Sequence, residues 1–118
     1  MKNITNWLGY HFSTGGETGD DYLNFQRAAR TDLKKKAAAA GFELHRFNKN
    51  HYEFSAVLKH TATGQFVYIS ISDVRFFPDE WYFNMLYRTM EHEADWTGGR
   101  NHHCCWDDIP TALKDLVA

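Results

Sequence analysis

The sequence lacks the features that mark several specialised classes of protein. Its two cysteines are neighbours, Cys104 and Cys105, and a disulfide between adjacent residues is a strained ring, so we expect no disulfide framework. No apolar run approaches the roughly 20 residues that a membrane span needs, and residues 1–12 lack the apolar core of a signal peptide. These absences predict a soluble, cytoplasmic protein with reduced thiols.

The sequence also lacks a large excess of charge of either sign. The formal net charge of the 118 residues is −2, whereas a dedicated DNA-binding chain is usually basic and a nucleic-acid mimic strongly acidic. Aromatic residues, in contrast, are abundant at 16%, and 43% of the chain is hydrophobic. That content is enough for a hydrophobic core, and the length fits a single domain over residues 1–118.

One long amphipathic helix is predicted over residues 19–40. Thr18 is placed to cap its first turn, and Gly41 follows its last alanine as a natural stop. Apolar residues recur along it at helical spacing. They are Tyr22, Phe25, Ala29, Leu33, Ala37 and Ala40.

After Gly41 the apolar period changes from helical spacing to alternation, which predicts strands. The predicted strands cover residues 42–48, 51–60, 65–74 and 82–90, with a short helix left open as an alternative for the last. Residues 106–118 have the pattern of a short C-terminal helix. The fold class is therefore α+β, with the long N-terminal helix packed on a four-stranded antiparallel meander sheet. The surplus aromatic residues either form a binding surface or seal the second face of the sheet, where the short helix would lie.

The segment "EHEADWTGGRNHHCCWDDI", residues 91–109, concentrates possible metal ligands. Neighbouring side chains diverge, so the run His102 to Cys105 cannot converge on one ion, and no second pair of ligands accompanies it. We expect a connecting loop with no metal, no cofactor and no catalytic residue. A metal-dependent hydrolase that uses His92, Asp95 and this run is the least favoured alternative.

Several stretches resemble a known pattern. They are "YHFSTGGETG", "HYEFSAVL", "TGQFVYISISDVRFFPDEW" and "MLYRTMEHEADWTGGRN", within residues 10–101. Together they resemble a family of small uncharacterised accessory proteins of bacterial phages, plasmids and integrative elements. The resemblance implies no established enzyme activity and places the protein in the cytoplasm of a bacterial host. That setting includes inhibitors of host defence such as anti-CRISPR proteins.

The candidate binding residues combine the positions that match this pattern with nearby tryptophans, because tryptophan is enriched in binding hot spots. They are Asp73, Arg75, Trp81, Arg88, Asp95, Trp96, Thr97, Gly98, Gly99 and Asn101. A structural role is the alternative, in which Asp73 and Arg75 hold the loop through Arg88 or Asn101.

These observations favour a non-enzymatic protein-binding accessory protein of a mobile genetic element. Its expected partner is a bacterial protein, either a CRISPR-type or other defence complex or a nucleic-acid machine. The alternative is a nucleic-acid-associated protein that uses the basic face of the long helix. That face consists of Arg27, Arg30, Lys34, Lys35 and Lys36.

Overall fold

The computed structural model describes residues 4–8, 20–49, 53–74, 79–92, 95 and 100–117. Five strands form one antiparallel meander in the order β1-β2-β3-β4-β5. The helical elements are η1 (Ile4–Trp7), α1 (Asp20–Ala39), α2 (Glu80–Phe83), η2 (Trp106–Asp108) and α3 (Ile109–Leu116). The strands are β1 (Phe42–Lys49), β2 (Phe54–His60), β3 (Phe66–Ser70), β4 (Met85–Met90) and β5 (His102–Cys104).

The predicted α+β architecture is confirmed, but the sheet has five strands where four were predicted. The additional strand, β5, lies in the segment that was predicted to be only a connector, and it pairs His102 with Tyr87 and Cys104 with Met85. Three residues are too few to show an alternating pattern, which is why the sequence did not indicate this strand. The ambiguous segment 82–90 contains both alternatives, because α2 ends at Phe83 and β4 begins at Met85.

The long helix is confirmed as α1, a helix of 20 residues. Its last residue is Ala39, one before the predicted end, and Gly41 follows as the predicted stop, with a φ of 81° in the left-handed region that glycine adopts without strain. Backbone hydrogen bonds from the N–H groups of Ala40 and Gly41 to Ala37 and Ala38 close its last turn. The predicted cap at Thr18 lies outside the described residues.

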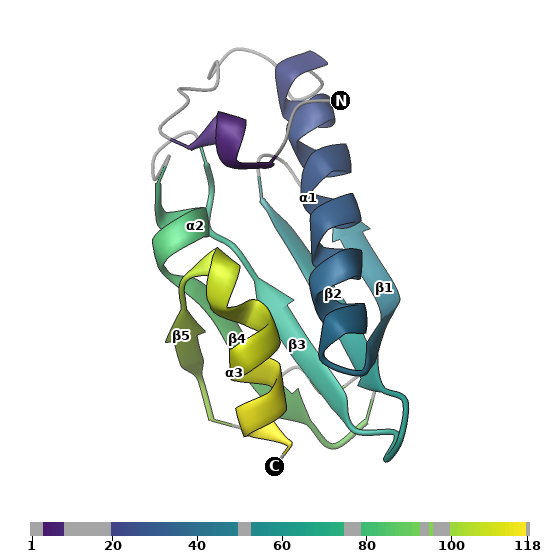
Figure 1. The fold of residues 1–118 in the computed structure, drawn as a ribbon. Coiled ribbons are helices and arrows are strands. Elements are labelled where there is room, and N and C mark those ends of the chain that lie inside the picture. Colours follow the sequence, from purple (N-terminus) through teal and green to yellow (C-terminus); the bar gives the residue numbers. More distant parts are fainter. Residues whose placement is uncertain are drawn as a thin grey trace.

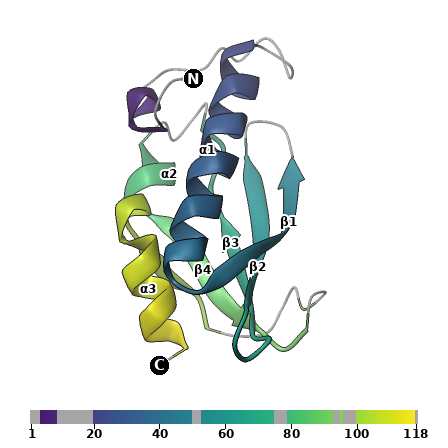
Figure 2. The same ribbon diagram turned by 45° about the vertical axis from the view of Figure 1, so that its right-hand side comes forward.

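Both longer helices cover the same face of the sheet. Figure 1 shows α1 in front of β1 and β2 and α3 in front of β3 and β4, and Figure 2 shows the two helices side by side. The expectation that the short helix would lie on the second face is therefore wrong. The reason is that Ile109 and Leu113 of α3 join the same hydrophobic core as Phe25 and Leu33 of α1.

Aromatic rings fill the core between these helices and the sheet. Phe25 packs edge-on against Trp81 at 5.1 Å between ring centroids, and Trp81 against Trp106 at 5.7 Å. Trp7 contacts Phe25 from η1 at 6.2 Å. Much of the aromatic surplus in the sequence is thus used on one side of the sheet. No helix in the described part of the chain has both the length and the apolar character needed to cross a membrane.

A β-bulge interrupts the pairing of β1 with β2 between Leu44 and Arg46. Leu44 and Phe47 both pack against the core although they are three residues apart, because the extra residue shifts the alternation. His45 and Arg46, between them, therefore both point to the opposite side of the sheet. The bulge places two consecutive nitrogen-rich side chains on the face that α1 and α3 leave uncovered.

Candidate binding face on the sheet

We define the helix-free face as the side of the sheet turned away from α1 and α3, where no described helix lies. The strand register arranges its side chains in three cross-strand rows. The first row is Glu43, Lys59, Phe66 and Met90, with His45 of the bulge beside it. The second row is Arg46, Val57, Tyr68 and Arg88. The third row is Asn48, Ser55, Ser70, Leu86 and His103.

The middle row holds a buried cation. The Arg88 guanidinium lies 4.8 Å from the centroid of the Tyr68 ring, on the neighbouring strand, and Arg88 is only 5% exposed. It also donates a hydrogen bond of 3.0 Å to the backbone carbonyl of Asp95. A positive charge over a ring face, with a hydrogen bond at its outer edge, is a stable arrangement for a buried guanidinium.

Asp95 organises the turn that follows β4. Its carboxylate accepts a hydrogen bond of 3.0 Å from the N–H of Glu91, and its own N–H donates to the carbonyl of His92 at 3.1 Å. The turn therefore folds back so that the Asp95 carbonyl meets Arg88. Two of the predicted site residues, Arg88 and Asp95, are thus brought together by a structural contact.

The first row carries an aromatic ring between two nitrogen-containing side chains. The Lys59 ammonium lies 5.8 Å from the centroid of the Phe66 ring, and the His45 imidazole packs edge-on against that ring at 5.2 Å. Phe66 and Lys59 are half-buried, while His45 is exposed. The Gln65 amide donates a hydrogen bond of 2.7 Å to the backbone carbonyl of Met90 and so holds the neighbouring backbone.

The third row forms the polar end of the face. Asn48 donates a hydrogen bond of 3.2 Å to the hydroxyl of Ser55, which pairs across the strands with Ser70. These serines and Tyr68 line an open pocket of about 130 Å³, which Glu53, Phe54 and Ile71 complete. Since a water molecule occupies about 30 Å³, the pocket has room for roughly four waters or for one projecting group of a larger ligand.

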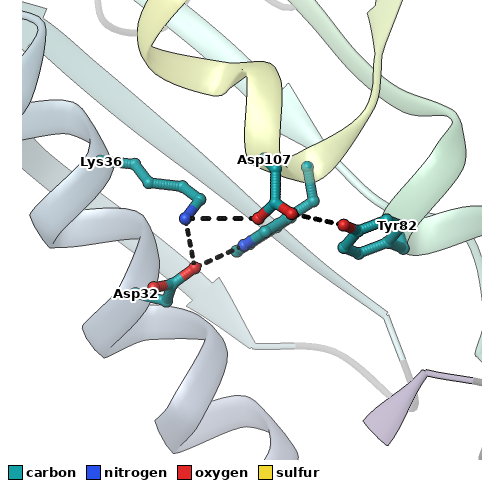
Figure 3. A network of polar contacts seen from close by, with 5 residues as sticks. Asp32, Lys36, Tyr82 and Asp107 are labelled. Carbon is teal, nitrogen blue, oxygen red and sulfur yellow. Dashed lines mark hydrogen bonds and ion pairs between the residues drawn. The ribbon is translucent and has the colours of Figure 1, made fainter. Parts of the chain in front are cut away.

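On the helix side, a polar network joins α1 to the C-terminal elements, as Figure 3 shows. Asp32 accepts a 2.7 Å hydrogen bond from the indole of Trp106 and pairs with Lys36 at 3.0 Å. Asp107 pairs with Lys36 at 3.7 Å and accepts a hydrogen bond from the Tyr82 hydroxyl. That hydrogen bond, with burial second, raises the pKa of Tyr82 well above its ordinary value. The network links α1, α2 and η2, so we assign it a structural role.

The histidines and cysteines of the C-terminal segment do not converge. The His102 ring stacks on Tyr87 at 5.3 Å, Cys104 packs against the core, and His103, between them, faces the other side of the sheet. Burial, followed by the nearby Asp108 and Cys105, raises the pKa of the Cys104 thiol to about 11. Within the described residues no group of three or more His, Cys, Asp or Glu side chains is placed to hold a metal ion.

Three of the remaining predicted residues lie in the described part of the chain. Trp81 is fully buried in the core, so its proposed role as a surface hot spot is wrong. Asp73 is half-buried and Asn101 is exposed. The other five lie outside the described residues: Arg75, Trp96, Thr97, Gly98 and Gly99.

The basic residues of the long helix fall into two groups, one residue that is ion-paired and four that are exposed. Lys36 is held between Asp32 and Asp107 and is not a member of a free basic stripe. The other four are exposed on α1. They are Arg27, Arg30, Lys34 and Lys35.

Sequence reasoning missed most of the helix-free face. The signal for Lys59, Phe66 and Tyr68 was present, since they alternate with core residues in strands that were predicted correctly. His45 and Arg46 had no such signal, because a bulge cannot be read from alternation. No family model, characterised protein or solved structure matches the chain, so the resemblance to accessory proteins of mobile elements remains a prediction.

Proposed function

We propose that this chain is a non-enzymatic binding module and that the helix-free face is the surface that contacts its partner. One observation carries the proposal. α1 and α3 lie together on one side of the sheet, and the other side presents half-buried rings and cations from three adjacent strands. Aromatic and cationic side chains together are typical of binding surfaces, since arginine, tyrosine and tryptophan are enriched in hot spots.

The dimensions of the face favour a large partner. Its pocket of about 130 Å³ is smaller than the roughly 300–1,000 Å³ of a small-molecule site. The groups around the pocket are spread over three rows of a sheet and do not enclose a cleft. A macromolecule that lies across the rows and inserts one group beside Tyr68 would use both features.

The sequence resemblance supplies the proposed setting, an accessory protein of a mobile genetic element in a bacterial cytoplasm. The proposed partner is accordingly a bacterial defence complex, of the CRISPR type or another, or a nucleic-acid machine. Arg46 and Lys59 would meet acidic groups of such a partner, and complementary charge chiefly determines the association rate and specificity.

Affinity capture from a bacterial lysate, with matched charge reversals, tests the proposal. The face variant is Arg46→Glu with Lys59→Glu, and the control is Arg30→Glu with Lys35→Glu on α1. We expect the wild type and the control to recover the same complex, and the face variant to lose it. If the face variant recovers the complex as well as the wild type does, the helix-free face is not the contact surface.

A second candidate function is nucleic-acid association through α1. The observation in its favour is that Arg27, Arg30, Lys34 and Lys35 are all exposed on this helix. The charge at Lys36 is unavailable because Asp32 and Asp107 pair with it. Salt-dependent DNA binding that disappears in the α1 variant and persists in the face variant would select this function.

A further inference from the structure

We propose that the exposed face of α1 contacts the phosphate backbone of double-stranded nucleic acid without reading its sequence. This inference rests on the second candidate function, because it takes α1 to be the nucleic-acid contact. It goes further by naming the form of the nucleic acid and the groups that α1 contacts. The proposal for the helix-free face does not enter the argument, because α1 lies on the other side of the sheet (Figure 1).

The exposed face of α1 is basic although the chain as a whole is slightly acidic. The net charge of the chain is −2, and Asp32 is the only acidic residue between Tyr22 and Ala39. Asp32 is turned towards the C-terminal elements, where it binds Lys36 and the Trp106 indole, as Figure 3 shows. The exposed side chains of this stretch are therefore basic or uncharged. They are Asn24, Arg27, Arg30, Thr31, Lys34, Lys35, Ala38 and Ala39.

The four exposed cations of α1 form no ion pair or hydrogen bond within the described part of the chain. Three of them, Arg27, Arg30 and Lys34, recur at helical spacing i, i+3 and i+7, so they lie along one side of the helix over about 10 Å. Like charges four residues apart, such as Arg30 and Lys34, repel each other and destabilise a helix. The fold therefore carries a repulsion that no internal contact relieves, and an anionic ligand would relieve it.

The row of cations fits a phosphate backbone better than a membrane surface. The guanidinium groups of Arg27 and Arg30 are planar forks that match phosphate oxygens, and a regular row of phosphates offers each cation of the face a partner. A helix that lies on a membrane inserts its apolar side between the lipids. The apolar side of α1, with Phe25 and Leu33, is buried in the core, so a lipid surface could not receive it.

The exposed face of α1 offers charge but no aromatic ring. None of its exposed side chains between Tyr22 and Ala39 is aromatic, whereas proteins that bind single strands usually stack the bases on aromatic rings. Double-stranded DNA carries one negative charge per about 1.7 Å of its axis, against about 3.4 Å for one strand. A surface that acts through charge is attracted more strongly to the denser charge, so the duplex is the favoured form. Contacts to phosphates carry no sequence information, so the binding is independent of sequence.

The experiment is fluorescence anisotropy of labelled probes with the full chain at salt concentrations from about 50 to 200 mM, where non-specific binding is strongly salt-dependent. The probes are a GC-rich duplex DNA, an AT-rich duplex of the same length, one strand of the first duplex alone, and polyglutamate. The α1 variant is Arg30→Gln with Lys34→Gln. The control is Arg46→Gln with Lys59→Gln on the helix-free face, which changes the net charge by the same amount. Far-UV circular dichroism checks that each variant is folded.

We expect four phosphate contacts to give a slope of log affinity against log salt of about −3.6 with the duplex, since each contact contributes about 0.9. The wild type should therefore lose about a hundredfold in affinity over this salt range, and the α1 variant, with two contacts left, about tenfold. The control should follow the wild type, because its two charges lie away from the contact. At the lowest salt the single strand should bind about tenfold more weakly than the duplex, because each of its contacts contributes only about 0.7 to the slope. The two duplexes should bind alike.

If the single strand binds as tightly as the duplex, or if the two duplexes differ several-fold in affinity, while the α1 variant loses binding, the inference fails and the second candidate function stands. If the folded wild type binds no oligonucleotide at the lowest salt, or if the α1 variant binds like the wild type, both fail. Polyglutamate bound as tightly as the duplex, with the same loss in the α1 variant, would make the ligand an acidic protein and would also overturn both. The helix-free face is tested separately by the lysate capture.

Discussion

Arg88 lies over the ring of Tyr68, with 4.8 Å between the guanidinium carbon and the ring centroid, and the two residues face each other across β3 and β4. This contact fixes the central ring of the helix-free face. It also ties that ring to the turn after β4, because the same guanidinium bonds the carbonyl of Asp95. The position of Tyr68 thus depends on a buried charge that a ligand does not need to touch.

Replacing Arg88 by methionine keeps much of its apolar stem but removes the charge. We expect the free energy of unfolding to fall by about 2 kcal/mol, from the lost cation–π contact and the lost charge-assisted hydrogen bond. Urea unfolding followed by tryptophan fluorescence measures this change. Arg30→Met, at an exposed position of α1, is the matched control and should change stability by no more than about 0.5 kcal/mol. Equal effects of the two substitutions would show that Arg88 contributes nothing specific.

Asp32→Ala removes the acceptor of the Trp106 indole, which is fully buried and donates at 2.7 Å. A buried N–H left without its acceptor costs about 1–2 kcal/mol of unfolding free energy. Asp32→Asn should cost less, because its amide oxygen still accepts from the indole. Lys36→Met removes only the ion pairs and should cost less than about 1 kcal/mol. If Lys36→Met proved as costly as Asp32→Ala in chemical denaturation, the ion pairs would be the dominant contact.

The raised pKa of the Cys104 thiol should make the fold less stable at alkaline pH. Its pKa is about 11 in the folded chain, chiefly through burial, against about 8.5 for a free thiol. The unfolded chain therefore loses this proton first, so the contribution to stability is complete below about pH 8.5 and declines as the pH rises towards 11.

Melting temperatures measured from pH 7 to 11 test this dependence. The decline should be shallower in Cys104→Ala, while Cys105→Ala, which keeps Cys104, should retain most of the wild-type decline, because burial is the largest cause of the raised pKa. Tyr82, whose pKa is also raised, contributes a similar loss above pH 10 in all three proteins. Identical curves for Cys104→Ala and the wild type would contradict the prediction.

Gly41→Ala tests the end of α1. The φ of 81° places the residue in the left-handed region, which costs an L-residue with a Cβ about 1–2 kcal/mol. An added Cβ would meet His60 Nε2 at 3.7 Å, an ordinary contact, so we expect the loss to come from backbone strain and not from a clash. Gly41→Asn should recover part of it, because asparagine tolerates this region better. Thermal denaturation ranks the three proteins. We expect the wild type to be the most stable, Gly41→Asn to be intermediate and Gly41→Ala to be the least stable, and any other order would exclude backbone strain as the cause.

The sequence predicted the elements with strong periodicity and missed those defined by tertiary pairing. α1 was predictable because its apolar stripe recurs over 20 residues and Gly41 ends it. β5 was not, since its three residues become a strand only by pairing with β4. The placement of α3 beside α1 also escaped prediction, because an amphipathic pattern shows that a helix has an apolar face but not which layer will cover it.

The candidate site was predictable only in part, for a related reason. Motif similarity indicated Arg88 and Asp95, and the structure joins them through a backbone carbonyl that no sequence pattern encodes. Trp81 was misassigned because composition alone cannot separate a core tryptophan from a surface one. Arg46 reached the helix-free face through a bulge, so its role depended on one irregularity in the pairing of β1 with β2.

The most direct measurement compares two exposed arginines on opposite sides of the molecule. The side-chain Nε–H signals of Arg46, on the helix-free face, and Arg30, on α1, can be followed by nuclear magnetic resonance while the partner recovered by affinity capture is added. The account predicts that the Arg46 signal shifts until it saturates while the Arg30 signal stays in place. A shift of Arg30 with Arg46 unmoved would contradict it.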